Sequence, residues 1–253
     1  PGARFGPRAI READYFGTPN TEVYHLGLGV YPTEVLRVVD FGDANCPPSS
    51  LEKSHEAVRV KVGEALDAGA LPIVLGGDHS ITLPSGTAVA RHHGFGTVGM
   101  VHFDAHADTG EDSYGGVLIS HGSPMRRLIE SGAIPGRNFV QVGLRGYWPA
   151  HDTFEWMRTQ GMRWHGMAEI ESRGFDAVLD DALRQALEGP EYVYLSVDVD
   201  VLDPAFAPGT GTPEVGGLTS YEAVSLVRLL AGFQTVGFDL VEVSPLYDGP
   251  GQI

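Results

Sequence analysis

Short apolar runs alternate with helical patterns along the chain, and this alternation constrains the fold more than any other feature. The apolar runs have the length of strands, and between them apolar residues recur at helical spacing. Strands that alternate with helices are typical of a parallel sheet, whose strands are buried on both faces. The sequence therefore predicts an α/β protein, a three-layer α/β/α sandwich with a mainly parallel central sheet.

The expected elements follow from apolar spacing and from residues that cap helices. Strands are predicted at residues 35–40, 71–75, 97–103, 139–144, 162–164, 192–197 and 236–241. Helices are predicted at 7–14, 49–69, 124–130, 152–159, 175–188 and 219–230, with a further one ending at 93. Because no repeat or low-complexity linker divides the chain, residues 1–253 are interpreted as a single domain. Pro1 and the loop-like residues 249–253 suggest truncation at both ends.

The charge balance bears on partners and location. Thirty-three acidic residues against 17 basic ones give a net charge of −16, which disfavours nucleic acid and anionic membranes and mildly favours a cationic ligand. The single cysteine, Cys46, excludes an internal disulfide and fits a reducing compartment. We find no apolar stretch long enough to span a bilayer and no signal-peptide pattern. A cytoplasmic location is therefore expected.

The segment Val101–Thr109 contains three potential metal ligands at every second position. Asp104, His106 and Asp108 follow an apolar run, so an extended backbone would direct all three side chains to one side. This arrangement predicts half of a metal site. The alternative is a polar loop in which the aspartates form turns.

Similar polar clusters follow other predicted strands, and the carboxyl ends of parallel strands form one ligand-binding edge. The candidate ligands are His79, Asp104, His106, Asp108, Asp198 and Asp200, and Glu242 follows the last strand. These ligands exceed what one tetrahedral zinc takes with a position left open, and they fit two divalent ions. A carboxylate-rich site with some imidazole suits Mn(II).

Four motifs together resemble the ureohydrolase family of arginases, agmatinases and related amidinohydrolases. They are Gly-Gly-Asp-His-Ser at 76–80, Asp-Ala-His-Ala-Asp at 104–108, Ser-Val-Asp-Val-Asp at 196–200 and Gly-Thr-Gly-Thr-Pro at 209–213. Their order and spacing match over nearly the whole chain. The resemblance implies the arginase-like fold, with its first strand and last helix missing from this sequence.

The resemblance also implies the ligand sets of two Mn(2+) ions per subunit, with Ni(2+) as an alternative metal. One ion would be held by His79, Asp104, Asp108 and Asp198, and the other by Asp104, His106, Asp198 and Asp200. Asp104 and Asp198 would bridge the two ions. Asp78, next to a ligand, is interpreted as a structural carboxylate, and Asp203, which precedes a proline, as a turn former.

Three further residues match functional positions of the family. His121 matches the histidine that transfers protons, although it could also be a loop histidine that packs its ring. Glu242 matches the carboxylate that receives the guanidinium, which agrees with the bidentate fit of these two groups. Thr212 matches a threonine beside the substrate, or it forms a turn. The implied reaction is attack of hydroxide on the guanidinium carbon, with Asp108 accepting a proton and His121 assisting the leaving amine.

The predicted substrate is a small cationic guanidino compound, with agmatine as the first candidate. The groups with which arginases grip the amino-acid end of arginine are replaced here by Gly110 and residues 117–120, so arginine is disfavoured. The alternatives are 4-guanidinobutyrate, 3-guanidinopropionate and free guanidine. The aromatic pair Tyr147 and Trp148 could line the pocket or simply pack against neighbours. The family suggests a homo-oligomer, a trimer or a hexamer.

Three other functions compete with this reading. A non-catalytic, metal-stabilised oligomer predicts losses among the ligands or at His121, and none is seen. A deacetylase-like single-zinc hydrolase would need only one ligand set, whereas both His79 and His106 are present. A formiminoglutamate hydrolase would share every metal ligand.

Overall fold

A six-stranded sheet forms the centre of the computed structural model, which describes residues 2–13, 23–112, 116–147, 149–230 and 233–249. The strand order is β1-β6-β5-β2-β3-β4, and every neighbouring pair is parallel. The strands are β1 (Ile73–Leu75), β2 (Val98–Phe103), β3 (Phe139–Leu144), β4 (Arg163–Gly166), β5 (Tyr192–Asp198) and β6 (Thr235–Val241). The predicted parallel sheet is confirmed.

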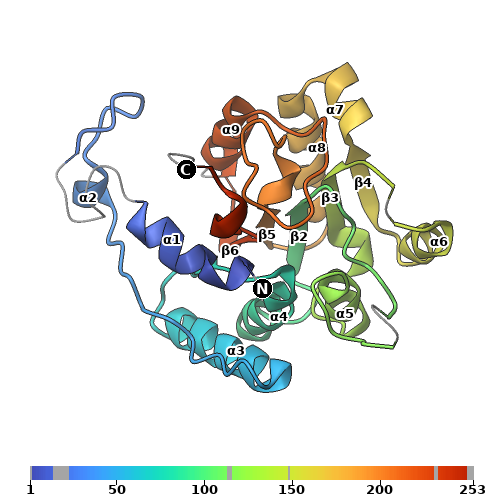
Figure 1. Ribbon diagram of the computed structural model, residues 1–253, viewed down its shortest axis with the longest axis horizontal. Coiled ribbons are helices and arrows are strands. Elements are labelled where there is room, and N and C mark those ends of the chain that lie inside the picture. The colour runs from blue at the N-terminus through green and yellow to red at the C-terminus, as the bar shows by residue number, and fades with distance from the viewer. Residues whose placement is uncertain (1, 14–22, 113–115, 148, 231–232, 250–253) are drawn as a thin grey trace.

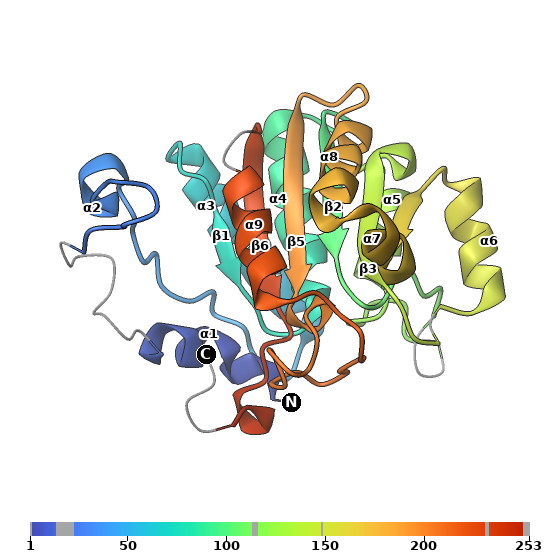
Figure 2. The same cartoon turned by 90° about the horizontal axis from the view of Figure 1, so that it is seen from above.

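Helices cover both faces of this sheet, which gives the three predicted layers (Figure 1). One face is covered by α3 (Leu51–Asp67), α4 (Thr82–His93), α5 (Pro124–Glu130) and α6 (His151–Thr159), and the other by α7 (Met167–Arg173), α8 (Phe175–Ala186) and α9 (Ser220–Leu230). Two short helices, α1 (Gly6–Glu12) and α2 (Pro32–Val35), lie on the β1 side of the molecule (Figure 2).

The apolar core consists of two clusters, one on each side of the sheet. In the first cluster, residues of α3 lie with residues of β2; these are Val58, Val62 and Leu66 of α3 and Val98 and Met100 of β2. In the second, the buried face of α8 lies with residues of β3 and β5. The three α3 residues recur every fourth position, so the helical period places them on one face. Ser50 caps this helix by accepting from the Lys53 amide, one residue after the predicted helix start at residue 49.

The strand prediction at 35–40 is wrong. Val35 ends α2, and the following residues to 46 run as extended chain without strand pairing. Val38 and Val39 are 57% and 72% exposed. A β-branched run forms a strand only when another strand offers it a hydrogen-bonding edge, and in the described structure this run has none. The short helix α7 was not predicted.

A row of polar residues crosses the centre of the sheet at one level. In the parallel register, Gln141 of β3 pairs with His102 of β2, His102 pairs with Ser196 of β5, and Ser196 pairs with Asp239 of β6. All four side chains are fully buried. We call these four residues the polar row. Its residues lie one to three positions before the carboxyl ends of their strands. These ends point to the same edge (Figure 2). Within the described residues, no helix has the length and apolarity to cross a membrane.

Candidate metal centre

The loops at the carboxyl edge of the sheet bring the predicted polar clusters together. His79 lies on a 3-10 turn after β1, Asp104 follows β2, Asp198 ends β5, and Asp200 lies on the next 3-10 turn. The ring or carboxylate of each is nearly or wholly buried. Glu242 follows β6 directly. The proximity expected from parallel strand ends is therefore observed.

The first group of ligand atoms surrounds the Nδ1 atom of His79. Carboxylate oxygens lie 3.1 Å from this nitrogen in Asp108 and in Asp198, and 3.2 Å from it in Asp104. These are the four residues predicted to hold one metal ion. Three carboxylates that converge on one imidazole nitrogen form a cage of hard ligands around a small volume.

The second group surrounds the Nδ1 atom of His106. An oxygen of Asp200 lies 3.0 Å from this nitrogen and an oxygen of Asp104 lies 3.4 Å from it. Asp104 directs Oδ2 to His79 and Oδ1 to His106, so it belongs to both groups. The second oxygen of Asp198 instead accepts from the backbone amide of Asp200 at 2.9 Å.

Among the described residues, the negative charges of the carboxylates in this site are not fully balanced by nearby cationic groups. Burial, together with the charges of Asp200 and Asp104, raises the pKa of Asp198 well above its usual range. Burial and the charge of Asp104 raise the pKa of Asp200 to about 6. Burial alone would also raise the pKa of Asp104, but the three histidines that face it hold that pKa well below its usual range. Crowded carboxylates of this kind are stabilised by cations.

The pKa values of His79 and His106 also show that the carboxylates around them lack positive counter-charge. Burial opposes a charge on His79, yet hydrogen bonds to Asp104, Asp108 and Asp198 raise its pKa well above the usual value. Burial likewise opposes a charge on His106, and its carboxylate partners raise its pKa to about 11. Divalent cations would supply this positive charge and would leave both imidazoles neutral, as metal ligation requires. The donor set therefore fits metal ions.

Hydrogen bonds behind His79 fix which of its nitrogens carries a proton. The Asp239 carboxylate accepts from Ser196 Oγ at 2.6 Å, so the single proton of the Ser196 hydroxyl is used in this hydrogen bond. Ser196 Oγ also lies 2.9 Å from His79 Nε2 and must accept from it. In the neutral ring that binds a metal ion, Nε2 therefore carries the proton and Nδ1 presents a lone pair to the first group. A metal-ligating histidine is commonly oriented in this way by a second hydrogen bond.

Glu242 lies beside the first group. Its Oε1 accepts from the backbone amide of His79 at 2.9 Å, and burial raises its pKa to about 7. The charge of His121 lowers this pKa, so these two predicted residues interact electrostatically. The loop of His121 is joined to the ligand loop through the hydrogen bond from the Gly110 amide to the Gly122 carbonyl. Thr212 donates to Asp200 Oδ2 at 3.0 Å, so it contacts a predicted ligand.

Backbone strain is concentrated at this site. Among the described residues, Asp108 (φ 50°) and Glu242 (φ 60°) are the only non-glycine residues with positive φ. Side chains with a Cβ avoid this region, and the cost is about 1–3 kcal/mol for each such residue. Strain of this kind collects at functional sites. Both residues were predicted to act in the reaction.

Several residues that complete the site were not predicted. His102 donates to Asp104 at 2.8 Å, and Gln141, Ser196 and Asp239 lie in the same polar row. Their signal in the sequence is a polar residue inside an otherwise apolar strand. Glu214 lies 4.0 Å from His106 Nε2, on the side away from Asp200.

Arg145 ties the loops around this site together. Its guanidinium donates to carbonyls of Gly143, Asp200, Val201, Leu202, Glu214 and Val215. Asp78 accepts from the Ser80 amide and Asp203 from the Ala205 amide in tight turns, consistent with the structural roles expected of them. Asp203 also accepts from the Gly216 amide of a following loop. Tyr147 is 94% exposed, and Trp148 lies outside the described residues.

Comparisons with known proteins place these features in one family. A model of the arginase family matches residues 1–253. The chain is 44% identical to a guanidinopropionase of Pseudomonas aeruginosa over 99% of this chain and 76% of that protein. It is 40% identical to a mitochondrial agmatinase of Gallus gallus, over 99% and 71%. The crystal structure of a Trypanosoma cruzi formiminoglutamase with Mn2+ has 30% identity and a TM-score of 0.86, over 98% and 80%. This chain therefore belongs to the arginase family and is an amidinohydrolase that acts on C–N bonds of guanidino or amidino compounds.

Proposed function

We propose that this protein is a binuclear-manganese amidinohydrolase that cleaves a small guanidino compound, agmatine, to urea and an amine, here putrescine. The observation that carries this proposal is the pair of ligand groups centred on His79 and His106, which share the Asp104 carboxylate. A carboxylate that faces both groups is able to bridge two adjacent divalent ions.

The metal assignment rests on the chemistry of the donor atoms. One ion would be held by His79, Asp104, Asp108 and Asp198, and the other by Asp104, His106, Asp198 and Asp200. These ligands are carboxylates with some imidazole and no thiolate, which suits Mn(2+), and Ni(2+) is the alternative. The matching formiminoglutamase with Mn2+ supports manganese.

The reaction uses the protein side chains around these ions. Bound there, two divalent cations would supply a water molecule whose pKa is low enough for it to react as a nucleophile at neutral pH. Glu242 would hold the guanidinium through paired N–H donors and position its carbon for attack. The first proton of the water would leave to solvent, and Asp108 would accept the second. His121 would deliver a proton to the amine nitrogen as the C–N bond breaks.

Local charge favours agmatine over a guanidino acid. Glu214 and Glu242 place negative charge beside the site, and Arg145 directs its N–H groups to backbone carbonyls rather than to a substrate carboxylate. A primary ammonium tail suits this field better than a carboxylate tail. The second candidate is an ω-guanidino acid, which the similarity to a guanidinopropionase supports.

The test is release of urea from agmatine, 4-guanidinobutyrate, 3-guanidinopropionate, arginine and guanidine, with Mn2+ and Ni2+ compared. Formiminoglutamate is assayed in parallel by release of formamide. We expect the highest kcat/KM with agmatine and Mn2+. Highest activity with a guanidino acid would transfer the proposal to the second candidate. If none of these compounds releases urea, the proposed reaction is wrong.

Two variants separate metal binding from substrate binding. Asp198→Ala should lose metal and turnover together, because it removes a carboxylate shared by both proposed ligand sets. Glu242→Ala should retain both metal ions and lose substrate. Metal content by mass spectrometry and turnover are measured on the same samples. Two retained ions in Asp198→Ala would contradict its bridging role.

A further inference from the structure

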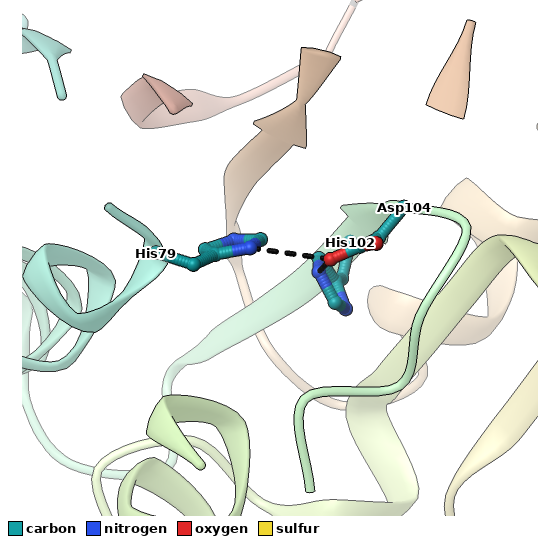
Figure 3. Close-up of side chains that lie close together, drawn as sticks. All are labelled: His79, His102 and Asp104. Atoms are coloured by element: carbon teal, nitrogen blue, oxygen red, sulfur yellow. Dashed lines mark hydrogen bonds and ion pairs between the residues drawn. The ribbon is translucent and has the colours of Figure 1, made fainter. Parts of the chain in front are cut away.

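His102 lies immediately behind the shared carboxylate. It is the fifth residue of β2, its side chain is fully buried, and its Nε2 lies 2.8 Å from Asp104 Oδ2. Oδ2 is the oxygen that also faces His79 Nδ1, at 3.2 Å. Figure 3 shows the imidazoles of His79 and His102 approaching the Asp104 carboxylate. His106 Nδ1 lies 3.4 Å from the other oxygen, Oδ1, so three imidazoles lie close to this aspartate. His102 has two conceivable roles: third histidine ligand or hydrogen-bond donor.

Gln141 decides between these roles. Its Nε2 lies 2.5 Å from the carbonyl oxygen of Ala107, which can only accept, so this atom is the amide nitrogen and donates. The same nitrogen lies 3.2 Å from His102 Nδ1. His102 Nδ1 therefore accepts from Gln141, and the ring proton is on Nε2, directed at Asp104.

A protonated ring nitrogen has no lone pair for a metal ion. We propose that His102 is a positioning residue: it donates one hydrogen bond to Asp104 Oδ2 and thereby fixes the plane of the shared carboxylate between the two metal ions. This inference rests on the metal centre in the proposed function. It assigns Gln141 the role of fixing the His102 tautomer, and it assigns the hydrogen bond from Gln141 to Ala107 the role of holding Gln141 in place.

The geometry of Asp104 shows why its plane needs support. Oδ1 accepts from the backbone amide of His106 at 2.6 Å, which fixes one end of the carboxylate. Oδ2 has the His102 N–H as its donor from behind and the His79 ring in front. Without His102, Oδ2 would be free to rotate about the fixed end. Outer hydrogen bonds of this kind commonly change metal affinity 10–100-fold.

The test compares two variants of His102 that both fill the buried site. His102→Phe keeps a ring and removes the N–H, whereas His102→Gln keeps an amide N–H near the position of Nε2. Manganese affinity is measured by metal content at increasing chelator concentration. The electron paramagnetic resonance spectrum reports whether two Mn2+ ions share a bridging carboxylate. Unfolding of the metal-free proteins is recorded as a control for folding.

We expect His102→Phe to bind manganese about 10–100-fold more weakly and to lose the spectrum of a coupled pair. His102→Gln should regain most of the affinity and the coupled spectrum. If His102→Phe does not fold, His102→Gln is compared with Gln141→Leu, which should show an intermediate affinity because the His102 tautomer is no longer fixed.

The outcomes separate the two proposals. If the wild-type protein takes up no Mn2+, the proposed function fails, and this inference fails with it. If the wild type holds a coupled pair and folded His102→Phe holds it with equal affinity, only the positioning role is refuted. A role of His102 as a metal ligand would instead appear as loss of a metal ion in His102→Gln as severe as that in His102→Phe.

Discussion

Replacement of Asp239 by asparagine would reverse the hydrogen bonds that set the tautomer of His79. Asp239 Oδ2 accepts from Thr82 and Tyr194 hydroxyls at 2.8 and 2.7 Å, and among the described residues Oδ1 accepts from Ser196 alone. The amide oxygen of the variant should keep the two donors, so its NH2 group faces Ser196. Ser196 then accepts, and its own proton turns to the nearest acceptor, His79 Nε2 at 2.9 Å, rather than to Thr82 Oγ1 at 3.3 Å.

In the neutral imidazole that metal binding requires, this reversal places the one ring proton on His79 Nδ1, the nitrogen that faces three carboxylates, instead of on Nε2. Binding of a metal ion must then first move that proton, and we expect manganese affinity to fall about 10–100-fold. The effect on folding is smaller. Each of the three hydrogen bonds weakens by about 1 kcal/mol when the acceptor loses its charge, but the variant also avoids burying that charge.

Metal content at increasing chelator concentration is the assay, and Tyr194→Phe is the matched control. The control removes one donor to Asp239 at 2.7 Å but leaves the Ser196 hydrogen bond intact. It should destabilise the protein by about 1–3 kcal/mol and retain wild-type metal affinity. Unchanged affinity in Asp239→Asn would refute the tautomer argument, and so would an equal loss in the control.

Three other perturbations have expected outcomes. Gly146→Ala would place a Cβ 2.7 Å from the Glu214 carboxylate, which lies near His106, so this variant should retain metal less well than the wild type. Gly132→Ala is the control, because Gly132 has a similar positive φ and open space around it, and metal content after dialysis distinguishes the two variants. Thr212→Val should lower kcat/KM about 10-fold or more and Thr212→Ser should not, because only valine loses the hydrogen bond to Asp200; equal kinetics would contradict this. The metal-free protein should lose stability as pH rises from 4 to 9. The raised pKa of Asp200 disfavours the folded state at pH values above the pKa of this group in the unfolded chain. The raised pKa of His106 stabilises the folded state only at pH values below the pKa of this group in the folded protein. Its melting temperature should fall, and saturating Mn2+ should flatten this dependence.

Much of the fold follows from the sequence because local patterns determine it. The period of the apolar residues identifies six of the strands, and parallel pairing follows from their alternation with helices. The segment 35–40 fails because a strand depends on a partner that its own residues do not specify. Helix α7 is seven residues long and directly follows β4, which leaves too short a pattern to recognise.

Some residues of the candidate site can be predicted from local sequence, and others cannot. His79, Asp104 and Asp198 could be predicted because each lies at or just after the end of a strand, and parallel strands end at one edge. His102 and Asp239 could not be assigned, because their contacts depend on the register between strands that are distant in sequence. That register aligns four polar residues into the polar row, and a single sequence does not contain it.

The left-handed backbone at Asp108 and Glu242 links stability to activity. The folded chain holds both residues in a conformation that a glycine would adopt at lower energy, so each proposed functional carboxylate lowers the stability of the chain that carries it. Substitutions that relax these two positions would increase robustness to heat while removing the groups assigned to proton transfer and guanidinium binding. Selection for thermal stability alone would therefore act against the proposed reaction at these two positions.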